Sequence, residues 1–148
     1  MPSIRTSFLC AAPVLAASVF AQNANTTAAQ DRRAAVAHVV ELKSSDGTLL
    51  KATYFGAAQP GPGVLLLHQS NRDRKSWEGL AVQFGASGLN TLALDMRGFG
   101  ESGGTRGDFK RMPEDVDVAL EFLMSQPGVD RQIIGLGGAG WLDRKSVV

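Results

Sequence analysis

Two stretches of the chain place glycines at the spacing G-x-G-x-x-G, which could bind a phosphate. They are GFGESG, from Gly98 to Gly103, and GLGGAG, from Gly135 to Gly140. The second follows an apolar run, and such glycines let the backbone approach a pyrophosphate at a helix N-terminus. The helix and the acidic residue about 20 positions later have no counterpart in the chain. A nucleotide-binding protein that uses GLGGAG is therefore one alternative hypothesis.

Metal chemistry and nucleic-acid binding have little support in the composition. The two histidines, His38 and His68, are far apart, and Cys10 is the only cysteine, so neither a Cys/His metal cluster nor a disulfide framework is expected. The 148 residues carry a formal net charge of +1, with acidic and basic residues mixed along the chain. This pattern provides no basic surface for nucleic acid. We expect no cofactor, no metal and no nucleic-acid partner.

A more specific signal comes from DMRGFGES, which resembles the D-x-R-G-x-G-x-S turn of the α/β-hydrolase family at every fixed position. The matching residues are Asp95, Arg97, Gly98, Gly100 and Ser102. LLLHQS resembles the family's H-G-x segment at His68, with Gln69 in place of the usual glycine. The resemblance implies that the backbone N–H of either Gln69 or Ser70 belongs to an oxyanion hole. It extends from Val39 to about Trp141 and implies that further strands, a catalytic acid and a catalytic histidine follow.

The same resemblance places a G-x-S-x-G nucleophile turn after the strand that begins with QII. In IIGLGGAGWL, one register puts Gly140 at the serine position, and a shift of one residue puts Ala139 there. We prefer Gly140, and Trp141 then supplies the second oxyanion N–H. Neither register has a Ser, Cys or Asp nucleophile, so we expect the chain as written to be inactive.

The resemblance implies that the full-length parent of this fragment is a serine hydrolase that cleaves an ester, a peptide or a related acyl bond, with a small-molecule or peptide substrate. A catalytically silent binding protein that kept the fold and lost the serine is the other alternative. An aspartate or cysteine nucleophile on the same fold is also compatible with the motifs.

Several of these residues also have a purely structural interpretation. His68 could hydrogen-bond a loop, and Asp95 and Arg97 could form an ion pair or cap a turn. The glycines after Arg97 favour tight backbone geometry. Trp77 is expected to pack in the core or against a loop and not to serve as a substrate platform, and NRDRKS is expected to be a solvated loop.

The elements that would position these residues can be predicted from periodicity. Alternating runs about Asp46-Gly47 predict a hairpin, and the apolar runs GPGVLLLH, LNTLALD and QIIGLGG predict buried strands. Apolar spacing predicts a helix from Trp77 to Gly88, and Pro113 marks the start of a second helix. The order implies an α/β fold, a partial α/β-hydrolase fold in which an N-terminal hairpin precedes a mainly parallel sheet with flanking helices.

The ends of the chain carry separate predictions. Residues 1–21 have the charged start, short apolar run and Val-x-Ala site of a signal peptide, which predicts a secreted or periplasmic protein without a stable membrane anchor. Residues 22–37 are expected to be a flexible lead-in, and 38–142 the N-terminal half of the hydrolase domain. DRKSVV is compatible with a common sequencing adapter read in frame, so 143–148 is expected to be a non-native tail.

Overall fold

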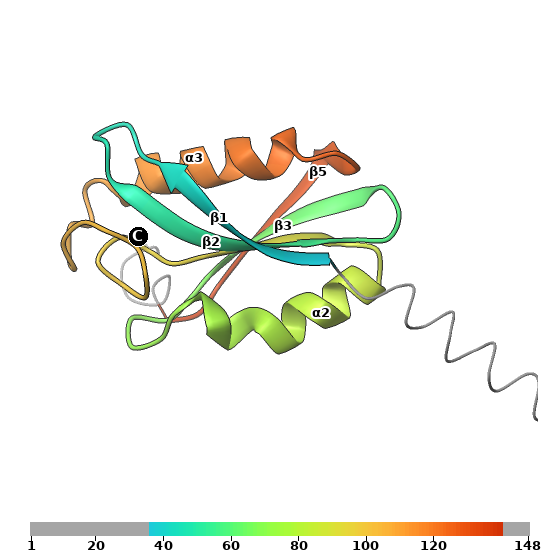
Figure 1. The fold of residues 1–148 in the computed structure, drawn as a ribbon, viewed down its shortest axis with the longest axis horizontal. Coiled ribbons are helices and arrows are strands. Elements are labelled where there is room, and N and C mark those ends of the chain that lie inside the picture. The colour runs from blue at the N-terminus through green and yellow to red at the C-terminus, as the bar shows by residue number, and fades with distance from the viewer. Residues whose placement is uncertain (1–35, 141–148) are drawn as a thin grey trace, which may run out of the picture. The chain divides into compact units, whose positions relative to one another are not determined.

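The computed structural model describes residues 36–140, which form a five-stranded sheet with helices on both faces (Figure 1). The strands are β1 (Val36–Lys43), β2 (Leu49–Gly56), β3 (Gly61–Leu67), β4 (Asn90–Leu94) and β5 (Val129–Gly138). Their order across the sheet is β1-β2-β4-β3-β5. β3 is parallel to β4 and β5, whereas β2 is antiparallel to β1 and β4. The predicted N-terminal hairpin and flanking helices are confirmed, and the described sheet is mixed, with two antiparallel and two parallel strand pairings.

The β1–β2 hairpin turns at Asp46-Gly47, as the alternation predicts. β1 begins at Val36, so the expectation that the lead-in extends to residue 37 is wrong. Val36 and Ala37 belong to the strand because they pair with Gly56 and Phe55 of β2.

The described helices are η1 (Arg74–Trp77, a 3-10 helix), α2 (Glu78–Ala86) and α3 (Met112–Ser125). Figure 1 shows α2 and α3 on opposite faces of the sheet. Trp77 lies in η1, one residue before α2 begins, and Pro113 lies in the first turn of α3, as predicted. Within residues 36–140, no helix is long and apolar enough to cross a membrane.

Each helix packs on its own apolar cluster because neighbouring strand residues point to opposite faces of the sheet. Leu65 of β3 packs in the cluster that contains Ala119 and Leu123 of α3. Leu66, the next residue, packs with Ala81 of α2. Trp77 is partly buried against this second cluster, in agreement with its expected packing role.

β5 departs from the prediction of a buried strand. It is the last strand of the described sheet and pairs with β3 on one side only. Its side chains are largely exposed, and Ile133 and Leu136 have 55% and 52% of their surface accessible. The apolar run was predicted correctly as a strand, but its burial depends on neighbours that lie across the sheet.

Candidate functional site

Three loops meet at the carboxyl ends of the parallel strands. One follows β3 from His68 to Asp73, a second follows β4 from Asp95 to Arg111, and Ala139 and Gly140 follow β5. In open α/β sheets, ligands bind in the crevice outside the carboxyl ends of the strands. The residues of both family-like motifs therefore lie where a site is expected.

His68 ties two of these loops together. It is fully buried, its Nδ1–H donates to the carbonyl of Gln69 (2.8 Å), and its Nε2 accepts from the backbone N–H of Met96 (3.0 Å). Its ring also contacts the edge of Phe99, with 5.3 Å between centroids. Both ring nitrogens are engaged within the protein, which corresponds to the structural interpretation of this residue.

Asp95 organises the turn after β4 from inside the protein. Its carboxylate is completely buried, pairs with the guanidinium of Arg74, and accepts the backbone N–H groups of Arg74 (2.7 Å) and Glu101 (2.9 Å). Asp95 thus caps the turn, as one of the two structural interpretations proposed. The other interpretation, an ion pair between Asp95 and Arg97, is wrong. Asp95 pairs with Arg74, and Arg97 pairs with Asp115.

Arg74 is the residue that the sequence analysis missed. The stretch NRDRKS was expected to be solvated, yet Arg74 is 3% exposed and also donates to Thr53 Oγ1 (3.1 Å) and Glu101 Oε2 (2.9 Å). Burial lowers the pKa of Arg74, but the Glu101 and Asp95 carboxylates outweigh it and raise the pKa overall. The same hydrogen bond from Arg74 lowers the pKa of Glu101. A buried aspartate needs a nearby cation, and this requirement is the one signal that could have identified Arg74 as the partner of Asp95.

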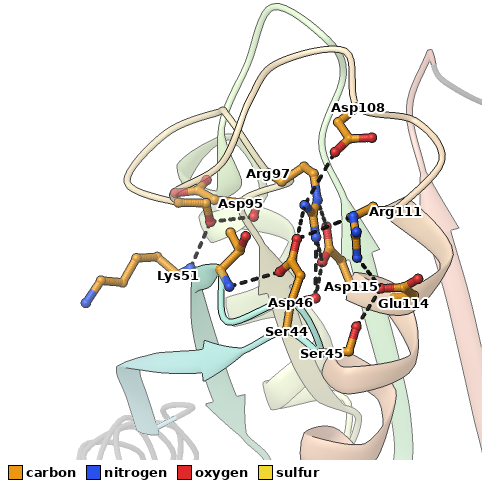
Figure 2. Close-up of polar contacts among 12 residues, drawn as sticks. Ser44, Ser45, Asp46, Lys51, Asp95, Arg97, Asp108, Arg111, Glu114 and Asp115 are labelled. Atoms are coloured by element: carbon orange, nitrogen blue, oxygen red, sulfur yellow. Dashed lines mark hydrogen bonds and ion pairs between the residues drawn. The ribbon is translucent and has the colours of Figure 1, made fainter.

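Arg97 forms the centre of a second polar group, the Arg97 cluster, consisting of Arg97, Asp46, Asp115 and Ser44 (Figure 2). Its guanidinium donates two hydrogen bonds of 2.6 Å to the buried Asp115 carboxylate and one of 2.9 Å to Asp46. Ser44 Oγ donates to Asp115 Oδ1 (2.7 Å). The hydrogen bonds to Asp115 raise the pKa of Arg97 despite its burial, and the hydrogen bond from Arg97 lowers the pKa of Asp46. The cluster joins the hairpin turn, the β4 loop and the first turn of α3.

The remaining motif residues shape the β4 loop. Ser102 Oγ donates to the carbonyl of Asp95 (2.6 Å) and accepts from the N–H of Lys51 (2.8 Å). The N–H of Gly98 donates to the carbonyl of Gly103 (2.8 Å). Gly100 has a φ of +54°, and a Cβ there would overlap the Asp95 carboxylate. These contacts explain why the motif requires a serine and glycines at these positions.

The structure brings Gln69 next to the residues that follow β5. Gln69 and Ala139 both line a hollow of about 400 Å³, together with Trp77. Gly140 has a φ of +74°, and a Cβ built on it would lie 2.8 Å from Gln69 Cγ. Ser70 is exposed in the same loop. Trp141, the signal-peptide segment and the 143–148 tail lie outside the described residues.

GLGGAG does not form a phosphate-binding turn. Gly135, Gly137 and Gly138 lie inside β5 and are in register with β3. The interpretation as a dinucleotide-binding fingerprint is therefore wrong, because its glycines must form the turn between a strand and a helix.

Comparison with known proteins identifies the family. The family model described as serine aminopeptidase, S33, matches residues 58–139, which is more than half of the chain. A thiohydrolase of Aspergillus aculeatus, aneE, is 32% identical over 105 residues and covers 67% of this chain and 32% of the relative. A polyketide transferase of Penicillium crustosum, claH, is 30% identical over 131 residues and covers 72% of this chain and 41% of the relative.

A solved structure supports the same fold. The α/β-hydrolase GrgF from Penicillium sp. sh18 superimposes with a TM-score of 0.65 at 27% identity, covering 70% of this chain and 37% of that protein. This likeness confirms the partial α/β-hydrolase fold expected from the sequence. The chain spans 32 to 41% of the length of these three proteins. It belongs to the S33 serine aminopeptidase family of α/β-hydrolases.

Proposed function

We propose that this chain carries the oxyanion side of a hydrolase that cleaves an ester, thioester or peptide bond. Family membership supports a hydrolase in general, and the name of the thiohydrolase aneE adds thioesters to the candidate bonds. Because the chain spans about a third of that relative's length, the activity and substrate of the whole protein belong to this proposal.

The observation that carries the proposal is the backbone conformation of Gly140. In this family the nucleophile occupies a sharp, strained turn after a strand, which exposes its side chain. Gly140 follows β5 by two residues and has a φ of +74°, whereas no residue other than glycine in 36–140 has a positive φ. Residue 140 thus has the left-handed backbone conformation that would be strained for a residue with a side chain, whereas Ala139 does not, which supports Gly140 as the nucleophile position.

The proposed reaction is nucleophilic attack on an acyl carbonyl at residue 140. The developing oxyanion would accept hydrogen bonds from the N–H of Trp141 and from that of Gln69 or Ser70. Glycine has no side chain to act as nucleophile, so we expect the chain with Gly140 to leave p-nitrophenyl acetate uncleaved above the buffer rate. Stoichiometric labelling of this chain by a fluorophosphonate would contradict that expectation.

A cysteine substitution tests the geometry without a catalytic base, because a thiolate is intrinsically nucleophilic. Gly140→Cys in a Cys10→Ser background has a single thiol. We expect p-nitrophenyl acetate to acylate it at least about tenfold faster per thiolate than the matched control Ala139→Cys, since one oxyanion donor contributes about 100-fold or more in enzymes. Circular dichroism checks that both variants fold. Equal acylation rates in two folded variants would refute the assignment of residue 140.

A catalytically silent binding protein is the second candidate, and the glycine at residue 140 favours it. The two candidates differ in the cysteine experiment. A site that retains its oxyanion donors accelerates acylation, whereas a binding site remodelled for another ligand does not.

Export is a further part of the proposal. Residues 1–21 carry the pattern of a signal peptide, so we expect secreted or periplasmic material to begin near Gln22. N-terminal sequencing of the protein from cell fractions tests this expectation, and a cytoplasmic product that retains Met1 would contradict it.

A further inference from the structure

The groove at the carboxyl ends of β3 and β4 extends well beyond Gly140. The hollow beside Gln69 and Ala139 is followed by a second one of about 530 Å³, and Arg72 and Ser76 line both of them. The second hollow is also lined by Phe99 and Arg106. A molecule held by its reacting end near Gly140 would therefore extend along Arg72 toward Arg106.

Two arginines line this groove, and neither has a carboxylate partner among residues 36–140. Neither Arg72 nor Arg106 forms an ion pair there, although Arg74, Arg97 and Arg111 all do. Arg106 lies over the Phe99 ring, 4.4 Å from its centroid, which restrains the position of its charge. The N–H of Arg72 donates to the carbonyl of Gln69 (2.9 Å), so its backbone is tied to the proposed oxyanion loop.

The acidic groups nearby leave the groove positively charged. Glu101 pairs with Arg74 and Lys75, and Asp95 is buried against Arg74. Asp73 also lines the second hollow, but one of its carboxylate oxygens accepts the N–H of Lys75 (3.0 Å). The positive charges of Arg72 and Arg106 thus exceed the single negative charge of Asp73, which suits a ligand with one negative charge.

We propose that Arg72 and Arg106 form a subsite for a carboxylate at the end of the substrate remote from the scissile acyl bond. This inference rests on the proposed function, because it specifies the substrate class of that same groove. A guanidinium binds a carboxylate through two parallel charge-assisted hydrogen bonds, and such bonds are stronger than neutral ones. The substrate class is then an ester, thioester or peptide that carries a free carboxylate.

Equilibrium binding tests the subsite on the full 148-residue chain. The probes are 4-phenylbutyrate and its uncharged amide, which share an apolar phenyl group for the hollow lined by Trp77 and Ala139. We expect the carboxylate to bind about tenfold more tightly than the amide in calorimetric titration, and this preference to decrease as salt is added. Equal affinities for the two probes would overturn the proposal.

Charge-neutralising variants locate the preference. We expect Arg72→Gln combined with Arg106→Gln to bring the affinities for the carboxylate and the amide within about twofold of each other. Lys110→Gln combined with Lys43→Gln is the matched control, since it also removes two positive charges, both from exposed positions outside the groove. A carboxylate preference that persists in the double variant, or that disappears in the control, would overturn the assignment.

The binding experiment needs no nucleophile, so its outcome is independent of the acylation experiment that tests the proposed function. Accelerated acylation of Gly140→Cys without any carboxylate preference would support the proposed hydrolase site and refute the carboxylate subsite. A carboxylate preference without accelerated acylation would support the anion-binding groove and refute the proposed hydrolase site.

Discussion

At Gly100, the buried carboxylate of Asp95 leaves room for a hydrogen atom and no more. A Cβ there would overlap the carboxylate, and the φ of +54° adds backbone strain. We expect Gly100→Ala to lower the free energy of unfolding by about 3 kcal/mol, the sum of a steric and a conformational cost.

The matched control is Gly107→Ala in the same loop. Gly107 also has a positive φ, of +90°, but a Cβ there would meet nothing within 4 Å. Only the conformational cost applies, and we expect a loss of about 1 kcal/mol. Urea unfolding followed by tryptophan fluorescence measures both values. Equal losses in the two variants would show that Asp95 does not restrict residue 100.

The buried pair of Arg74 and Asp95 gives a second expectation at the same scale. Removing one member leaves an uncompensated charge inside the protein, so we expect Arg74→Met to cost about 3 kcal/mol of unfolding free energy. Adding Asp95→Asn to Arg74→Met should recover part of that loss, because the stranded charge is removed. Arg72→Met, an exposed arginine two residues earlier, should change stability by less than about 0.5 kcal/mol. Additive losses from Arg74→Met and Asp95→Asn would contradict the pairing.

Between elements, the Arg97 cluster makes the attachment of α3 to the hairpin sensitive to acid. The pKa of Asp46 lies below its ordinary value because Arg97 hydrogen-bonds to its carboxylate. A carboxyl group with a depressed pKa in the folded state stabilises the protein above its ordinary pKa, about 4, and this contribution is lost as the pH falls through the folded value.

We therefore expect Asp46→Asn to be less stable than the wild type at pH 7 and to differ from it less and less below about pH 4. Chemical unfolding across this pH range measures the difference. Asp117→Asn on the exposed side of α3 is the control and should run parallel to the wild type. A stability gap that stays constant down to pH 2 would show that Asp46 does not contribute through its charge.

Local elements were predictable from the sequence, whereas contacts between elements were not. The hairpin at Asp46-Gly47 and the helix start at Pro113 depend on a few adjacent residues, and both are confirmed. The partner of Asp95 lies 21 residues away, and that of Arg97 lies 18 residues away on a helix. The motif identified both polar residues but contains no information on which distant side chain meets them.

The same limit applies to the site. Sequence resemblance brought Gln69 and Gly140 into one hypothesis, and the fold places them in contact range. Arg72 and Arg106 lie in loops without any spacing signal, and only the folded loops bring them along one groove.

At the scale of the whole molecule, the exposed apolar residues of β5 are expected to favour self-association. Ile133 and Leu136 are each more than half exposed, on a strand that pairs on one side only among residues 36–140, and apolar strand edges promote pairing between chains. We expect Leu136→Lys to shift the sedimentation profile toward monomer. Val82→Lys, which adds the same charge at an exposed apolar position on α2, is the control and should leave the profile unchanged. Equal effects of the two variants would indicate a general effect of net charge.

The Arg97 cluster also bears on the order of events during folding. Its hydrogen bonds join residues 51 positions apart (Arg97 to Asp46) and 71 positions apart (Ser44 to Asp115), so long segments must close before they form. Closing such loops costs chain entropy before any contact compensates for it, which delays these contacts until the hairpin and helices are in place. Interactions that form after the rate-limiting step leave the folding rate unchanged and slow unfolding. The cluster would then determine how long the native state lasts and have little influence on how quickly it is reached.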